Sequence, residues 1–257
     1  MELNGRSAIV TGGAGGLGSA TVRHLVGLGM HVVIFDWDGE GAAALAKELG
    51  TERATGLGGD TTNDDDVQRA IEAGQAAGTL SLLVNVAGGG VGGGRLLDRS
   101  GKPHDKTSFI KTMEMNALGT FNMSRLTVAA MAQNEPDEHG QRGVIVNTAS
   151  IAGIEGQSGQ LAYGTAKAAI LGMTLPMARD LAPVGIRVCA IAPGTMGTPK
   201  MMSVPDALME RLVKDIQFPK RLGRPEEFAF LVESIARNPY LNGENIRLDG
   251  ALRFPPK

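Results

Sequence analysis

The pair of side chains best suited to acid–base chemistry is Tyr163 and Lys167, which stand four residues apart in a segment with a helical pattern. Side chains at this spacing lie on one face of a helix, so the phenol and the ammonium are expected to be neighbours. A phenol normally titrates near about pH 10. A nearby positive charge favours the phenolate and brings the tyrosine into the range of a general acid–base catalyst. Such a pair can also lie on a helix surface without a catalytic role, but the chain has only two tyrosines.

A second group of residues suits the binding of a dinucleotide. Gly12, Gly16 and Gly18 follow the spacing GxxxGxG between a predicted strand and a predicted helix. Glycines at such a turn let backbone N–H groups approach a pyrophosphate and let the helix pack closely on the sheet. Glycine is frequent in this chain, with 37 of 257 residues, so the pattern alone also fits an ordinary tight turn.

An acidic residue strengthens the dinucleotide interpretation. Asp36 ends the second predicted strand, where a carboxylate can accept hydrogen bonds from both ribose hydroxyls of adenosine. The same charge repels a 2′-phosphate, and neither neighbour, Phe35 or Trp37, is basic. The sequence therefore predicts NAD as the cofactor rather than NADP.

These residues must be positioned by strands and helices that alternate along the chain. Apolar runs predict strands at 6–11, 31–36, 54–60, 80–87, 142–150, 185–192 and 244–248. Helical patterns occupy a segment ending at 28 and the ranges 38–49, 63–77, 107–133, 160–181 and 225–237. This alternation predicts an α/β fold with right-handed crossovers: a Rossmann-type, doubly wound parallel sheet of about seven strands with helices on both faces. No linker is evident, so residues 1–257 are expected to form a single NAD-binding catalytic domain.

Two segments have no clear periodic pattern. Residues 88–106 begin with a run rich in glycine, and residues 195–219 follow the sixth predicted strand. Both come after strands and are therefore expected at the carboxyl ends of the sheet, where ligands bind in such folds. The first is predicted to be a flexible loop beside the site, and the second a substrate loop.

Composition excludes several classes of function. The net charge of −2 shows no basic excess, which disfavours nucleic-acid binding. The single cysteine, Cys189, rules out an intrachain disulfide, and the four histidines lack metal-ligand spacing. No apolar stretch approaches the roughly 18 residues of a membrane span. The first residues resemble neither a signal peptide nor a transit peptide, so a cytoplasmic location is expected, with the mitochondrial matrix open for a eukaryotic source.

In chain order, these motifs resemble those of the short-chain dehydrogenase/reductase family. The motifs that carry the resemblance are the loop Thr11–Gly18, Asn85-Val86-Ala87-Gly88, Asn116 within Met115-Asn116-Ala117, Ser150, Tyr163-xxx-Lys167 and Pro193-Gly194. Ser150 precedes Tyr163 by 13 residues, the usual spacing in the family. Val86 departs from the family pattern, which usually has a second asparagine there.

The resemblance implies an enzyme that transfers a hydride between NAD and a substrate. Tyr163 would exchange a proton with the substrate oxygen, while Lys167 would lower the pKa of the tyrosine and hold the nicotinamide ribose. Ser150 would donate a hydrogen bond to the developing alkoxide, and Asn116 would hold the backbone and the water that pass the proton to solvent. No metal site is implied. The implied cofactor-binding residues are Gly12, Gly15, Gly16, Leu17, Gly18, Asp36, Asp60, Thr61, Val86, Ala87, Gly88, Tyr163, Lys167, Pro193, Gly194, Met196 and Thr198.

The second half of the chain resembles one subgroup of the family, through residues 147–156, 172–187, 197–199, 221–223, 238–244 and 246–250. This likeness implies a homotetramer that acts on the 3-hydroxyl or 3-keto group of an acyl-CoA in fatty-acid or branched-chain degradation. The alternatives are an NAD-dependent dehydrogenase of hydroxysteroids or other secondary alcohols, and a non-catalytic NAD-binding scaffold. Flexible methionines can mould around an acyl chain or a steroid ring, or fill gaps beneath a lid helix. The methionines in question are Met196, Met201, Met202 and Met209.

Overall fold

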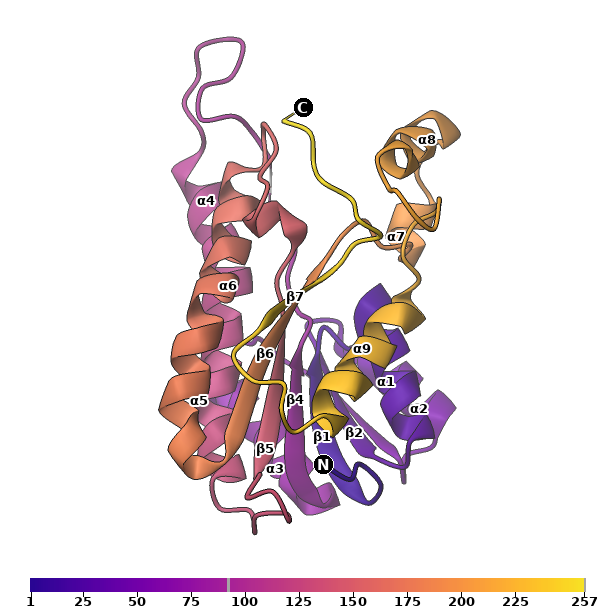
Figure 1. Cartoon of the computed structure of the whole chain (residues 1–257), viewed down its shortest axis with the longest axis vertical. Helices are drawn as coiled ribbons and strands as arrows, with labels where there is room; N and C mark the ends of the chain where they lie inside the picture. Colours follow the sequence, from indigo (N-terminus) through magenta and orange to yellow (C-terminus); the bar gives the residue numbers. More distant parts are fainter. Residues whose placement is uncertain (92, 257) are drawn as a thin grey trace.

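A seven-stranded, all-parallel sheet with helices on both faces forms the fold in the computed structural model, which describes residues 1–91 and 93–256 (Figure 1). The strands are β1 (Arg6–Thr11), β2 (His31–Asp36), β3 (Ala54–Gly58), β4 (Thr79–Asn85), β5 (Gly143–Thr148), β6 (Ile186–Pro193) and β7 (Asn245–Leu248). Their order in the sheet is β3-β2-β1-β4-β5-β6-β7. The predicted α/β fold and its parallel sheet are confirmed. The order reverses between β1 and β4, and ligands bind at the carboxyl ends of strands at such a reversal.

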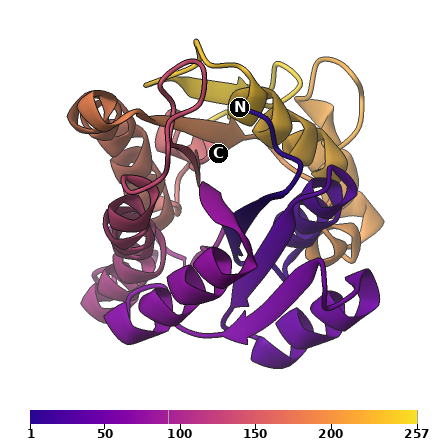
Figure 2. The same cartoon turned by 90° about the horizontal axis from the view of Figure 1, so that it is seen from below.

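The helices divide between the two faces of the sheet (Figure 2). They are α1 (Gly16–Gly27), α2 (Gly39–Leu49), α3 (Asp64–Ala77), α4 (Lys106–Met113), α5 (Gly119–Met131), α6 (Leu161–Leu181), α7 (Pro199–Met202), α8 (Asp206–Lys214) and α9 (Pro225–Arg237). Ala8 and Val10 pack with α1, α2 and α9, whereas Ile9 packs with α3 and α5 on the opposite face. Successive strand residues point to opposite faces, so burial on both sides explains the nearly continuous apolar runs.

The predicted continuous helix at 107–133 is interrupted, contrary to expectation. A π-helical turn, Glu114–Leu118, separates α4 from α5. Within it, the Asn116 side chain donates a hydrogen bond from Nδ2 to the Thr112 carbonyl oxygen at 2.8 Å. A side-chain donor that bonds to this carbonyl competes with the regular helical ladder. Turns of this kind are frequent at functional sites.

The segment 195–219, predicted without regular structure, contains two short helices, α7 and α8. The apolar side chains of α8, which include Met209 and Leu212, pack against Ile216 and Leu222. These helices begin after Thr198 and Pro205 and are too short to show a clear period in the sequence. We call α7 and α8 together the lid.

The predicted flexible loop at 88–106 also has local order. Isolated bridges join Gly94 to Gln160 and Leu97 to Pro103, and the segment projects beyond α4 at the top of Figure 1. Gly92, part of the glycine run, lies outside the described residues. Among the helices that the structure describes, none is both long and apolar enough to span a lipid bilayer.

Candidate active site

A cleft of about 720 Å³ extends over the carboxyl ends of β1, β2 and β4, and we call it the cofactor cleft. The predicted cofactor residues that line it are Gly12, Gly15, Gly16, Leu17, Gly18, Asp36, Asp60, Thr61, Val86, Ala87 and Gly88. Residues that are distant in the sequence meet here because β1 lies between β2 and β4. The structure thus brings the glycine loop and Asp36 to the same cleft.

Three glycines of the loop could not carry side chains in this geometry. Gly12 has a positive φ of 61°, and a Cβ there would lie 2.8 Å from the Ala87 Cα. A Cβ on Gly18 would collide with the Gly12 carbonyl oxygen. A Cβ on Gly16 would lie 2.7 Å from the Thr198 Cβ at the start of the lid. The loop is therefore a bare backbone cradle at the N-terminus of α1, which fits a pyrophosphate.

Asp36 is held in place at the end of β2. Its Oδ2 accepts a hydrogen bond from the Ala14 backbone N–H at 2.9 Å, and its Oδ1 accepts one from the Asp38 N–H at 3.0 Å. A carboxylate oxygen can accept more than one hydrogen bond, so both oxygens keep the capacity to bind ribose hydroxyls. Trp37, the next residue, is 81% exposed and also lines the cofactor cleft.

The residues predicted to catalyse gather around a smaller cleft of about 190 Å³, which we call the catalytic cleft. The predicted residues that line it are Leu17, Val86, Gly88, Ser150, Tyr163, Lys167, Pro193, Gly194 and Met196. The two clefts adjoin, because Leu17, Val86 and Gly88 line both. An extended cofactor that spans them would have its reactive end beside Tyr163.

Tyr163 and Lys167 share the inner face of α6, as their spacing predicts. The Lys167 Nζ lies 5.8 Å from the centre of the Tyr163 ring and donates a hydrogen bond to the Thr148 carbonyl oxygen at 2.8 Å. Lys167 is only 3% exposed, and this burial lowers its pKa to about 8.

The pKa of Tyr163 is set chiefly by burial. Burial raises it above its ordinary value, and the hydroxyl of Ser150 opposes this rise only in part. Burial of the phenol is the larger of these two influences, and the expected lowering of this pKa by Lys167 stays a prediction. Tyr163 is therefore a neutral phenol near pH 7, ready to donate a proton.

Ser150 stands at the end of β5, where it caps the short 3₁₀ helix Ile151–Gly153. Its Oγ accepts a hydrogen bond from the Ala152 backbone N–H at 3.1 Å. A hydroxyl that accepts one bond still has its own proton to donate. Ser150 can therefore direct an O–H group toward Tyr163 or toward a substrate oxygen.

Asn116 contacts the backbone rather than either cleft. It is fully buried, and its Nδ2 donates to the Gly89 carbonyl oxygen at 2.7 Å, while its Oδ1 accepts from the Gly89 N–H at 3.1 Å. A Cβ on Gly88 would collide with Asn116 Oδ1 and lie 3.3 Å from Lys167 Nζ. Asn116 thus fixes the turn that lies against the Lys167 ammonium. The predicted backbone-holding role fits this geometry.

Thr198 is not among the residues that line the two clefts, and its contact with the nicotinamide stays a prediction. Its side chain packs over Gly16, and its Oγ1 accepts a hydrogen bond from the Met201 N–H at 3.4 Å to cap α7. The hydroxyl is used within the lid, whereas the other predicted nicotinamide neighbours, Pro193 and Gly194, line the catalytic cleft.

Two buried polar contacts beneath the site were missed by sequence reasoning. Asn85 donates from Nδ2 to Asn147 Oδ1 at 2.9 Å across β4 and β5. The Thr11 Oγ1 accepts hydrogen bonds from the N–H groups of Val86 and Ala87, both at 3.1 Å. The sequence signal that could have indicated these contacts is a polar residue at the end of an apolar strand. These contacts fix the strand ends that form the floor of both clefts.

Comparisons with known proteins agree with this geometry. The profile of the short chain dehydrogenase family matches residues 6–208. Human 3-hydroxyacyl-CoA dehydrogenase type-2 is 48% identical over 256 residues, which span 99% of this chain and 98% of that protein. The Drosophila melanogaster protein of the same name is 46% identical over 250 residues, or 97% of this chain and 98% of that protein.

A solved structure is similar over its whole length. The crystal structure of 3-hydroxyacyl-CoA dehydrogenase type-2 from Mycobacterium avium superposes with a TM-score of 0.95 at 49% sequence identity. The superposition covers 100% of both chains. The lid and the C-terminal residues are thus part of the likeness, as well as the sheet.

Proposed function

The chain belongs to the short-chain dehydrogenase family, and we propose that it is an NAD-dependent 3-hydroxyacyl-CoA dehydrogenase. Membership makes it an oxidoreductase that uses a nicotinamide cofactor. The observation that carries the substrate proposal is the near-full-length identity to relatives of that name, with Ser150, Tyr163 and Lys167 around one cleft. The reaction interconverts a 3-hydroxyl and a 3-keto group on an acyl thioester.

NAD is supported over NADP by the charge at the end of β2. The Asp36 carboxylate lines the cofactor cleft, and a 2′-phosphate beside it would bring two like charges together. Lys111 also lines this cleft, but the acid Glu114 lines it as well. The glycine loop, Asp36 and Asp60 would hold the adenosine and the pyrophosphate, and Lys167 would hold the nicotinamide ribose.

In the reducing direction, NADH held in the cofactor cleft would supply the hydride for the carbonyl carbon. Tyr163, neutral near pH 7, donates its proton to the carbonyl oxygen. Ser150 donates a hydrogen bond to the same oxygen as negative charge develops there. The Lys167 ammonium, held by the Thr148 carbonyl oxygen, stabilises the tyrosinate that remains. In the oxidising direction, the Tyr163 anion takes the proton from the 3-hydroxyl group.

A homotetramer is proposed on family likeness and on exposed apolar residues. The helices α4, α5 and α6 lie along one flank of the sheet (Figures 1 and 2). Exposed apolar side chains on this flank are Ile110, Leu118, Phe121 and Leu161. Large apolar side chains exposed on one flank favour a subunit interface there. Light scattering coupled to size-exclusion chromatography measures the mass, and a monomer would contradict the proposal.

The substrate proposal is tested by steady-state oxidation of NADH with acetoacetyl-CoA, with NADPH in a parallel series. We expect efficient turnover with NADH and weak turnover with NADPH. Negligible turnover of acetoacetyl-CoA, together with good turnover of hydroxysteroids or simple secondary alcohols, would replace the proposal with that alternative.

A further inference from the structure

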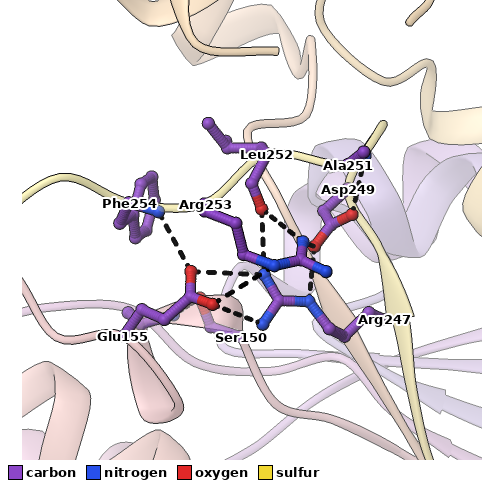
Figure 3. A network of polar contacts seen from close by, with 9 residues as sticks. Ser150, Glu155, Arg247, Asp249, Ala251, Leu252, Arg253 and Phe254 are labelled. Atoms are coloured by element: carbon purple, nitrogen blue, oxygen red, sulfur yellow. Dashed lines mark hydrogen bonds and ion pairs between the residues drawn. The ribbon is translucent and has the colours of Figure 1, made fainter. Parts of the chain in front are cut away.

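The C-terminal tail, residues 250–256, is fixed to the loop after β5 by a network of ion pairs (Figure 3). Arg247 in β7 donates hydrogen bonds from Nη1 to Glu155 Oε1 at 2.8 Å and from Nη2 to Oε2 at 3.3 Å. Its Nε also donates to Asp249 Oδ2 at 2.6 Å, and its Nη2 to the Leu252 carbonyl oxygen at 2.9 Å. A guanidinium that forms two parallel hydrogen bonds with a carboxylate fixes the relative orientation of the two groups as well as the distance between them. Arg247 therefore joins the loop, the end of β7 and the tail.

Glu155 holds the tail from the other side. Its Oε2 accepts a hydrogen bond from the Phe254 backbone N–H at 3.0 Å. Glu155 and Arg247 are 25% and 22% exposed, so salt screens this pair less than a fully exposed one. Two contacts continue along the tail: Gln157 Nε2 donates to the Pro255 carbonyl oxygen and the Ser158 N–H to that of Pro256, each at 3.1 Å.

The same network reaches both sides of the catalytic cleft. Ile151, the residue after Ser150, and Glu155 lie at the two ends of one hydrogen-bonded turn, in which the Glu155 N–H donates to the Ile151 carbonyl oxygen at 2.8 Å. At the other side, a Cβ on Gly194 would lie 2.8 Å from the Asp249 Cβ. A displacement of Glu155 or Asp249 would therefore shift Ser150 or Gly194, which line the catalytic cleft.

The tail presents an apolar side to the lid. Leu252 is only 2% exposed and belongs to the same apolar cluster as Ile151, the residue after Ser150. Phe254 packs on the same cluster. The lid side chains that complete this cluster are Met201, Met209, Leu212 and Val213. Tail and lid thus meet in an apolar contact that begins one residue from Ser150.

We propose that Glu155 and Arg247 are a positioning pair, which holds Leu252 and Phe254 as the fixed wall of the acyl-chain subsite, against which the lid closes. The inference rests on the proposed function. Because Ile151 is fully buried, an acyl chain that leads away from a carbonyl between Ser150 and Tyr163 would run along the partly exposed members of this cluster, which include Phe254. Each methylene that it buries there gains binding free energy, and a wall that moves loses part of that gain.

The test is the dependence of kcat/KM on acyl-chain length in Glu155→Gln. Glutamine keeps the size of the side chain and an oxygen for the Phe254 N–H, but removes the charge that Arg247 binds. With NADH saturating, acetoacetyl-CoA and 3-ketodecanoyl-CoA are compared. We expect the ratio of kcat/KM for the long to the short substrate to fall about fivefold or more, mostly through KM. Binding of NADH should change by less than about twofold.

Two further variants separate this role from general stability. Glu48→Gln removes a similar forked pair with Arg23 on the surface of α1 and α2, and should leave the ratio unchanged. Leu252→Ala keeps the ion pair but removes the wall, and should lower the ratio as Glu155→Gln does. Partial unfolding alone lowers both rates together and leaves their ratio intact.

The possible failures are distinct. An unchanged ratio in both Glu155→Gln and Leu252→Ala overturns the inference and leaves the proposed function standing. Absence of turnover of either acyl-CoA by the unaltered enzyme overturns the proposed function, and the inference with it.

Discussion

The Lys167 ammonium lies 5.8 Å from the centre of the Tyr163 ring and is bound to the Thr148 carbonyl oxygen at 2.8 Å. Burial moves the two pKa values in opposite directions: that of Tyr163 rises above its ordinary value, and that of Lys167 falls to about 8. The buried cation therefore destabilises the fold near neutral pH. The same cation is ready to stabilise a tyrosinate once the phenol has given up its proton.

Removal of this cation should stabilise the protein. In the folded state the pKa of Lys167 is about 8, below its ordinary value of 10.5, so the unfolded chain binds the extra proton between these two values. The free energy of unfolding therefore rises with pH across that window. Below pH 8 it is reduced by the full cost of burying the Lys167 ammonium. We expect Lys167→Met to raise the free energy of unfolding by about 1 to 2 kcal/mol at pH 7, because the gain from removing the charge exceeds the loss of the hydrogen bond to Thr148.

Denaturant unfolding of Lys167→Met and the unaltered protein, at pH 7 and again near pH 10, measures this effect. The advantage of the variant should shrink at the higher pH, and its activity should be nearly lost at both. A variant that is less stable at pH 7 would show that Lys167 is not a destabilising buried cation.

Gly88 should not tolerate even a methyl group. Its φ is 155°, and a Cβ would meet Asn116 Oδ1 and approach Lys167 Nζ. Gly88→Ala should therefore reduce kcat by about tenfold or more, because a small misplacement of a catalytic group is costly. Gly90→Ala is the matched control, since a Cβ there meets nothing within 4 Å. Equal rates for the two variants would contradict the proposed packing around Lys167.

Asp36 should determine the choice of cofactor. In Asp36→Asn the shape is kept and the charge that repels a 2′-phosphate is lost. We expect the preference for NADH over NADPH, measured as a ratio of dissociation constants, to fall by about tenfold or more. Asp38→Asn, which changes a nearby carboxylate that caps α2, should preserve the preference. A protein that binds NADPH as tightly as NADH before any substitution would contradict the proposed role of Asp36.

The single tryptophan offers a direct signal for cofactor binding. Trp37 lines the cofactor cleft beside Asp36 and is 81% exposed. NADH bound in this cleft absorbs where tryptophan emits, so we expect strong quenching of Trp37 emission with energy transfer to the nicotinamide. Trp37→Phe should abolish the transfer but retain NADH-dependent turnover. Saturating NADH with no change in Trp37 emission would place the cofactor elsewhere.

Local patterns were sufficient for much of the fold. The bounds of β1, β2 and α9 are as predicted, because each follows an apolar run or a helical pattern that ends at glycine, aspartate or asparagine. The π-helical turn at Asn116 was not predicted, because it arises from a side-chain hydrogen bond within a segment of ordinary helical composition. The lid helices were missed because they are short and charged.

Contacts that depend on tertiary structure could not be predicted from the sequence. Glu155 and Arg247 are 92 residues apart and meet only because β7 pairs beside β6. The pKa of Tyr163 depends on how deeply α6 buries the phenol, which its spacing from Lys167 does not reveal. The cytoplasmic location stays a prediction, since nothing in the fold bears on it.

The central claim is that Tyr163 donates the proton in NADH-dependent reduction of a 3-ketoacyl-CoA. It is tested most directly by the rate of a single turnover of acetoacetyl-CoA by NADH-saturated Tyr163→Phe, with NADH binding followed through Trp37. Phenylalanine keeps the ring and removes only the hydroxyl. We predict a dissociation constant for NADH within about threefold of that of the unaltered enzyme and a rate lower by about a thousandfold. A rate within tenfold of the unaltered enzyme would contradict the assignment of Tyr163 as the proton donor.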